Sequence, residues 1–104
     1  MVRDMRKLRS GIVGCGRIAG LSESLPHDNM PFTHAGAYES LSDAVTLSAI
    51  CDTNSLALSK FSKMWNIENV YSSHKEMLLK EEIEILSVCV DAEHHYNICM
   101  DAIS

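Results

Sequence analysis

Hydrophobic and polar positions along the chain alternate between two periods. Four short apolar runs predict strands, at residues 8–13, 45–51, 70–71 and 83–90. Around these runs, apolar residues recur at helical spacing, which predicts helices over 34–41, 57–65, 73–79 and 92–103. Strands that alternate with helices in this way form right-handed βαβ units. The pattern therefore predicts an α/β fold with a parallel sheet.

Capping residues and turns mark the ends of the predicted helices. Asn54 or Thr53 suits the N-cap of the second helix, and Ser73 begins an S-x-x-E capping box. Asp91 is placed to cap the last helix, whose apolar stripe comprises Ala92, Tyr96, Cys99 and Ile103. We interpret the acidic run 81–84 as a solvated turn before the fourth strand.

The first predicted strand leads directly into the motif Gly14-Cys15-Gly16-Arg17-Ile18-Ala19, which fits G-x-G-x-x-G/A. Gly14 permits a tight turn, and the missing Cβ of Gly16 lets a pyrophosphate approach the backbone. Ala19 allows the following helix to pack closely on the strand. The anion would then face backbone N–H groups and the positive end of a helix. The alternative is that the glycines serve only a turn.

A carboxylate, Asp52, directly follows the second predicted strand. It is placed to accept hydrogen bonds from the adenosine ribose, and it would repel a 2′-phosphate, which favours NAD over NADP. Gly14 and Asp52 lie 38 residues apart, against a usual separation of about 20. A predicted loop over 21–33, with two prolines, accounts for the excess. Asp52 could instead cap the next helix. A methyltransferase also carries an acid here, but its usual acid before the glycine loop is missing from residues 10–13.

Together these features predict a Rossmann-like open parallel sheet with strand order 3-2-1-4. Four strands in this order form half of a doubly wound domain, so the domain is incomplete. The fourth strand then has an open edge, and an exposed apolar edge promotes self-association. We therefore expect a homo-oligomer.

Charge and composition exclude several function classes. Nine Lys and Arg against 14 Asp and Glu give a net charge of −5, which offers a polyanion no attraction, so we expect no nucleic-acid partner. No apolar run approaches the roughly 18–20 residues that cross a bilayer. The apolar stretch after the basic start is too short for an export signal. We expect no membrane partner and a cytoplasmic location.

The cysteines are widely spaced and form no C-x-x-C pair: Cys15, Cys51, Cys89 and Cys99. In a reducing compartment we expect them to be free thiols that pack as small apolar side chains. Cys89 and Cys99 with His94 and His95 match no tetrahedral zinc spacing, so we expect no metal. His95 falls just beyond the fourth strand, at the edge where open α/β sheets bind ligands. A surface histidine at a helix start is the alternative.

Several segments share their order and spacing with one known family: 11–19, 33–38, 47–52, 70–78 and 83–90, followed by His95. In this arrangement, residues 7–104 resemble the N-terminal part of the Gfo/Idh/MocA family, named for glucose–fructose oxidoreductase and inositol dehydrogenase. The resemblance implies an NAD-dependent oxidoreductase that moves hydride between the nicotinamide and a secondary alcohol carbon of a sugar or cyclitol. The implied cofactor-binding residues are Gly14, Cys15, Gly16, Arg17, Ile18 and Ala19 at the pyrophosphate, Asp52 at the ribose, and Val90, Asp91 and His95 on the nicotinamide side.

The chain departs from the family pattern in two ways. After the fourth strand the family usually has a Thr-Pro-Asn turn, whereas this chain has Val90-Asp91-Ala92. Asp91 adds negative charge near a negatively charged cofactor, so we expect altered binding there. The family's catalytic lysine and its substrate histidine and aspartate belong to regions beyond Ser104, so no catalytic residue is assigned. We expect residues 1–104 to be the N-terminal part of a dinucleotide-binding domain, with the C-terminal substrate domain absent and the fragment alone inactive.

Two other function classes stay open. One is a non-catalytic nucleotide-binding or regulatory module. The other is a structural domain that binds nothing and dimerises through its strand edge. A concentration-dependent dimer that shows no thermal shift with nucleotides would indicate the second.

Overall fold

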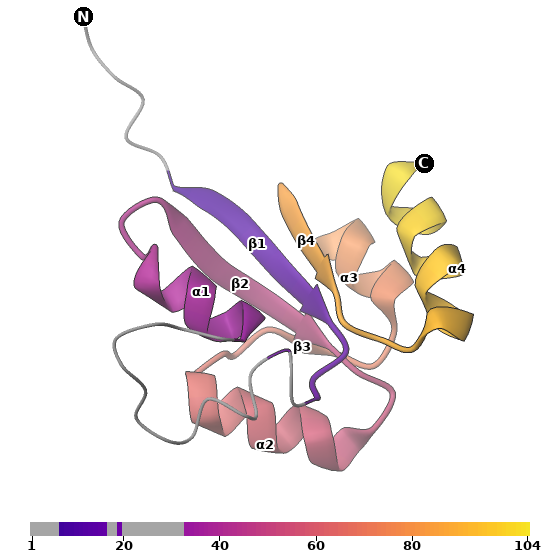
Figure 1. Cartoon of the computed structure of the whole chain (residues 1–104), viewed down its shortest axis with the longest axis horizontal. Coiled ribbons are helices and arrows are strands. Elements are labelled where there is room, and N and C mark those ends of the chain that lie inside the picture. Colours follow the sequence, from indigo (N-terminus) through magenta and orange to yellow (C-terminus); the bar gives the residue numbers. More distant parts are fainter. Residues whose placement is uncertain (1–6, 17–18, 20–32) are drawn as a thin grey trace, which may run out of the picture.

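The computed structural model describes residues 7–16, 19 and 33–104. The strands are β1 (Leu8–Val13), β2 (Val45–Cys51), β3 (Val70–Tyr71) and β4 (Ile85–Val88). The helices are α1 (His34–Ser40), α2 (Ser55–Trp65), α3 (His74–Lys80) and α4 (Ala92–Ile103). All strand pairs are parallel, in the order β3-β2-β1-β4 (Figure 1). The predicted fold class and strand order are confirmed.

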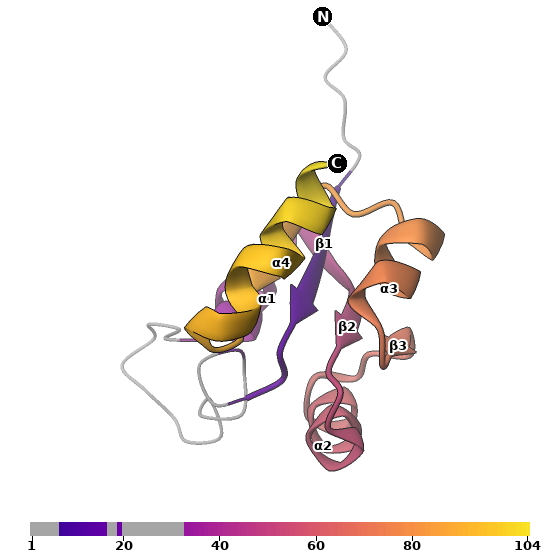
Figure 2. The same cartoon turned by 90° about the vertical axis from the view of Figure 1, so that its right-hand side faces the viewer.

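Two apolar clusters, one on each face of the sheet, hold the helices in place. The first contains residues of β1, β2, α1 and α2, among them Ile12, Ile50, Ala35 and Phe61. The second contains residues of β1, β2, α3 and α4, among them Val13, Cys51, Met77 and Ile98. Because neighbours along a strand point to opposite faces, β1 and β2 bury side chains on both. In the turned view of Figure 2, helices stand on both sides of these strands.

The fourth strand is shorter than the predicted run 83–90. It pairs with β1 from Ser10↔Ile85 to Val13↔Val88, and β1 turns away directly afterwards. One further bond forms, in which the Cys89 N–H donates to the Val13 carbonyl at 2.7 Å. The apolar residues beyond Val88 pack against the core clusters, and this packing, not strand pairing, accounts for their character.

The predicted caps are in place. The Asn54 side chain accepts hydrogen bonds from two N–H groups in the first turn of α2, at 3.0 and 3.1 Å. Asn54, and not Thr53, is therefore the cap. Ser73 caps α3, and Asp91 caps α4. The predicted loop 21–33 lies outside the described residues except for Thr33, which caps α1.

Helix α4 turns a different face to the core from the predicted stripe. Among its described side chains Ile98 is the buried one, whereas Tyr96 and Ile103 of the stripe are 68% and 79% exposed. A hydrogen bond between Asp101 of α4 and His74 of α3, 2.7 Å long, lies on the same side as Ile98. The spacing predicted the helix correctly but not its rotation, because apolar residues occur on both sides of it.

The acidic run 81–84 is not a solvated turn throughout, which corrects the sequence interpretation. The side chain of Glu81 is only 9% exposed. It accepts hydrogen bonds from the Tyr71 hydroxyl at 2.5 Å and from Arg9 Nη2 at 3.2 Å. The Glu81 bond raises the pKa of Tyr71. A carboxylate tolerates burial when a cation and a hydroxyl both bond to it, and this one ties the end of α3 to β1 and β3.

Candidate functional site

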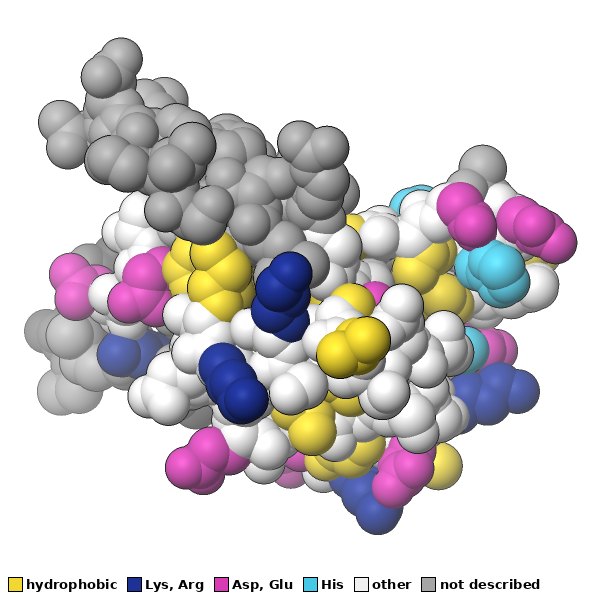
Figure 3. All heavy atoms as spheres, turned by 90° about the horizontal axis from the view of Figure 1, so that it is seen from below, with side chains coloured by type: hydrophobic (Ala, Val, Ile, Leu, Met, Phe, Trp, Pro, Cys, Tyr) yellow, Lys and Arg dark blue, Asp and Glu magenta, His cyan; other side chains and the backbone are white. Residues whose placement is uncertain are grey.

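The described site residues lie at one edge of the sheet, where the parallel strands end. The glycine turn follows β1, Asp52 follows β2, and Val90 and Asp91 follow β4. His95 is exposed near the start of α4. Arg17 and Ile18 lie outside the described residues. Figure 3 shows the molecule from this side, with acidic and histidine side chains gathered where α4 begins.

Gly14 turns the chain out of β1 in a conformation that other residues rarely adopt. Its φ is +97°, in the region that favours glycine. A Cβ at this position would lie 2.5 Å from the Cys89 carbonyl oxygen and 3.1 Å from Val90 Cγ1. The Gly14 N–H also donates to the Cys51 carbonyl at 2.8 Å. The turn therefore fits between the ends of β2 and β4 only as glycine.

The absence of a side chain at Gly16 has a different consequence from that at Gly14. In the part of the chain that the structure describes, a Cβ there would meet nothing within 4 Å, and the residue is exposed. Its backbone is therefore approachable from outside, as close contact with a pyrophosphate requires. The glycine turn fits a dinucleotide at this point.

Asp52 holds the glycine turn as well as the end of β2. Its Oδ2 accepts a hydrogen bond from the Cys15 N–H at 2.7 Å, and its Oδ1 accepts one from the Asn54 N–H at 2.8 Å. Each carboxylate oxygen has a further lone pair, and the residue is partly exposed. The same group is therefore able to accept hydrogen bonds from a diol. The bond to Cys15 was not foreseen from the sequence.

The Cys15 thiol belongs to the core. The side chain is fully buried, and its Sγ donates to the Cys51 carbonyl at 3.6 Å. Burial, together with the Asp52 carboxylate, raises the pKa of the Cys15 thiol to about 12. Such a thiol stays protonated at neutral pH and is a poor nucleophile. All four cysteines are free, as predicted.

Two side chains that contact each other, Asp91 and His94, lie at the start of α4. Asp91 Oδ1 accepts a hydrogen bond from the His94 N–H at 3.2 Å and lies 2.7 Å from His94 Nδ1. The pair lowers the pKa of Asp91 and raises that of His94 above 6.5. Glu93 brings a third ligand atom within 4.8 Å of the other two. All three side chains are exposed, an arrangement that is common on surfaces without an ion.

The pair is expected to stabilise the fold only over a middle range of pH. Because the pKa of Asp91 is lowered by folding, its carboxylate stabilises the fold at pH values above the pKa of Asp91 in the unfolded chain. This stabilisation is lost as the pH falls through the pKa of Asp91 in the folded chain. Because the pKa of His94 is raised by folding, its imidazole stabilises the fold at pH values below the pKa of His94 in the unfolded chain. This stabilisation is lost as the pH rises through the pKa of His94 in the folded chain.

In an NMR titration, His94 should therefore have its midpoint above 6.5. The Asp91→Asn variant keeps a capping side chain and should return the midpoint toward that value. A midpoint at or below it in the parent chain would contradict the pairing.

His95 makes a different contact from its neighbour. Its Nδ1 lies 3.6 Å from Cys99 Sγ, one turn further along α4. Its role toward a cofactor stays a prediction.

One partly buried polar cluster was not predicted from the sequence. Ser87 of β4 is 8% exposed, and its Oγ lies 3.0 Å from His34 Nδ1 and 2.6 Å from the Tyr38 hydroxyl, both on α1. We call these three residues the Ser87 cluster. The available signal was a serine inside an otherwise apolar strand, since a buried hydroxyl requires partners.

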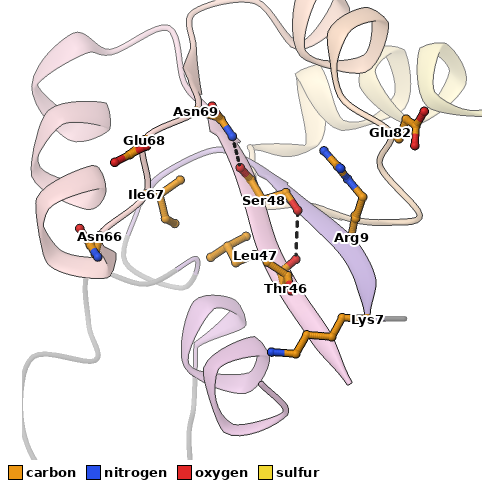
Figure 4. A pocket seen from close by; sticks show the side chains of 10 residues that line it. All are labelled: Lys7, Arg9, Thr46, Leu47, Ser48, Asn66, Ile67, Glu68, Asn69 and Glu82. Carbon is orange, nitrogen blue, oxygen red and sulfur yellow. Dashed lines mark hydrogen bonds between the residues drawn. The ribbon is translucent and has the colours of Figure 1, made fainter. Parts of the chain in front are cut away.

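A hollow of about 600 Å³ lies at the opposite edge of the sheet (Figure 4). Lys7 and Arg9 line it from β1 and the residue before it, and Glu68 and Glu82 from the loops. Its floor is formed by the first half of β2. The strands begin at this edge, so the hollow is remote from the glycine turn.

The comparisons with known proteins agree with the geometry of the glycine turn. A family model, GFO_IDH_MocA, described as an oxidoreductase family with an NAD-binding Rossmann fold, matches residues 8–104. The chain belongs to this family. The Gfo/Idh/MocA resemblance inferred from the motifs is thereby confirmed. No curated protein matched the chain.

Several solved structures that are similar to the Gfo/Idh/MocA chain are dehydrogenases. The WlbA dehydrogenase from Chromobacterium violaceum, in complex with NADH and UDP-GlcNAcA, is 25% identical with a TM-score of 0.77, over 96% of this chain and 25% of that one. The WlbA dehydrogenase from Bordetella pertussis, with the same ligands, is 32% identical with a TM-score of 0.69, over 86% and 24%. Scyllo-inositol dehydrogenase from Lactobacillus casei, with NAD(H) and scyllo-inositol, shares the fold at 18% identity and a TM-score of 0.74, over 94% and 25%.

The Gfo/Idh/MocA chain spans about a quarter of the length of these structures. In the part that the structure describes, no helix has the length and apolar character needed to cross a membrane.

Proposed function

We propose that the chain binds NAD at the carboxyl edge of its sheet and serves an oxidoreductase that acts on a secondary alcohol of a sugar or cyclitol. One observation carries the proposal. Asp52 accepts a hydrogen bond from the glycine turn at Cys15, and the described residues leave open space at Gly16. The proposed pyrophosphate site and the proposed ribose site are thus joined by a direct hydrogen bond.

Each part of this edge has a defined task in the proposal. Gly16 and the following residues, Arg17 and Ile18, would offer backbone N–H groups to the pyrophosphate. Asp52 would accept hydrogen bonds from the ribose hydroxyls and repel a 2′-phosphate, so NAD is preferred over NADP. Val90 and Asp91, with His95 beyond them, would border the nicotinamide half. The bound nicotinamide supplies the hydride acceptor or donor.

The substrate class is supported by what similar proteins bind. The two WlbA dehydrogenases hold a nucleotide sugar, UDP-GlcNAcA, beside NADH. We therefore propose a sugar or cyclitol substrate. No described residue of this chain is assigned a catalytic role in the proposal.

Replacing Asp52 with alanine is expected to weaken NADH binding about 30-fold or more, because the hydrogen bonds that the ribose hydroxyls donate to the charged carboxylate are lost along with the bond to Cys15. Calorimetric titration with NADH and NADPH measures the change. The parent chain should bind NADH more tightly than NADPH. The Asp52→Ala variant should not gain NADPH affinity in compensation, because the glycine turn loses the hydrogen bond between the Cys15 N–H and Asp52.

The control removes an equal charge elsewhere. Asp43 is exposed in the turn before β2, and Asp43→Ala should leave NADH affinity unchanged. Equal affinity of the parent chain for both dinucleotides, or normal NADH binding by Asp52→Ala, would refute the ribose assignment.

A further inference from the structure

The Ser87 cluster joins α1 to β4. A single buried hydroxyl serves both partners, His34 in the first turn of α1 and Tyr38 one turn later. If the Tyr38 hydroxyl donates to Ser87, the Ser87 hydroxyl is free to donate to His34 Nδ1, so the three groups satisfy one another. Two hydrogen bonds on one helix face fix both the position and the rotation of α1 against the sheet.

The same helix turn also holds the end of the glycine motif. Ala35 follows His34 directly, and its N–H donates to the Ala19 carbonyl at 2.7 Å. Ala35 and Ala19 are both fully buried and belong to one apolar cluster with Ile12 and Cys15. The start of α1 is therefore bound on one side to β4, through Ser87, and on the other to Ala19.

We propose that the Ser87 cluster positions the end of the glycine motif: by fixing α1 to β4, Ser87, His34 and Tyr38 hold Ala19, the last residue of the motif, in the place that favours NADH binding. The inference rests on the proposed function, because it assigns positioning residues to that same site. None of the three needs to touch the cofactor. A loop held in place before binding gives higher affinity than one that must be ordered by the ligand.

The test measures NADH affinity in two variants of the full chain. Ser87→Ala removes the shared hydroxyl, and Tyr38→Phe removes one bond while keeping the ring. Each is expected to weaken NADH binding about fivefold to tenfold, the equivalent of one net hydrogen bond. Ser87→Thr keeps a hydroxyl at this position and should restore affinity to within about twofold of the parent chain.

A matched control separates positioning from general loss of stability. Ser10, near the start of β1, is also a buried serine, and its Oγ donates to the Thr46 carbonyl at 2.9 Å. Ser10→Ala should lower the melting temperature as Ser87→Ala does, but leave NADH affinity within about twofold of the parent chain.

The outcomes distinguish this inference from the proposed function. If the parent chain binds NADH and both cluster variants bind it equally well, the positioning role is refuted and the NAD site stands. Equal weakening by Ser10→Ala also refutes the positioning role. If the parent chain binds no NADH, the proposed function itself fails and the inference falls with it.

Discussion

Replacing Gly16 with valine is expected to abolish measurable NADH binding while leaving the fold intact. A Cβ at Gly16 meets nothing within 4 Å among the described residues, so we expect the free chain to accommodate the larger side chain. The valine would occupy the space through which a pyrophosphate must approach the backbone. We expect a loss of about 100-fold or more in affinity, equivalent to about 3 kcal/mol. Calorimetric titration measures the affinity, and thermal melting checks the fold.

The Gly16→Ala variant tests the same steric effect on NADH affinity with a smaller side chain. One added carbon should weaken binding less than valine and should not change the melting temperature. Normal NADH binding by Gly16→Val would mean that the cofactor does not pass over this turn, and the proposed site would then be wrong.

Replacing Gly14 with alanine, in contrast to Gly16→Val, is expected to cause a large loss in the stability of the fold. Its φ of +97° strains any side chain, and the new Cβ would lie 2.5 Å from a backbone oxygen, that of Cys89. Backbone atoms cannot move aside as a flexible side chain does. The combined cost is about 3 kcal/mol, a large fraction of the stability of a small domain. Urea unfolding measures it.

Gly16→Ala is the matched control for this prediction, because it makes the same chemical change two residues away in open space. If Gly14→Ala unfolds at the same urea concentration as the parent chain, the contact between the glycine turn and the end of β4 is not as described. A fall in stability at both positions would show that any side chain in the motif disturbs the fold.

The strand order and the place of the glycine turn could be predicted because they depend on local patterns. Short apolar runs, helical spacing between them and the handedness of βαβ units leave few topologies. The same rules bring the ends of β1, β2 and β4 to one edge, so the sequence alone predicts that Gly14, Asp52 and Asp91 lie together. The caps at Asn54 and Ser73 were predictable for the same reason, since each acts within its own turn.

Features set by contacts between distant segments were not predictable. The length of β4 depends on where β1 turns away, and the rotation of α4 depends on the pairing of Asp101 with His74. The burial of Glu81 requires Arg9 and Tyr71 from two other strands. The bond from the Cys15 N–H to Asp52 likewise spans 37 positions of sequence. Sequence periodicity carries no information about such partners.

A crystal structure of the chain with NADH tests the central claim most directly. The account predicts electron density for the pyrophosphate over Gly16 and the ribose hydroxyls within hydrogen-bond distance of the Asp52 carboxylate, with the Cys15 N–H still bonded to that group. Density at the opposite edge of the sheet, for example in the hollow beside Lys7 and Arg9, or a ribose out of reach of Asp52, would contradict it.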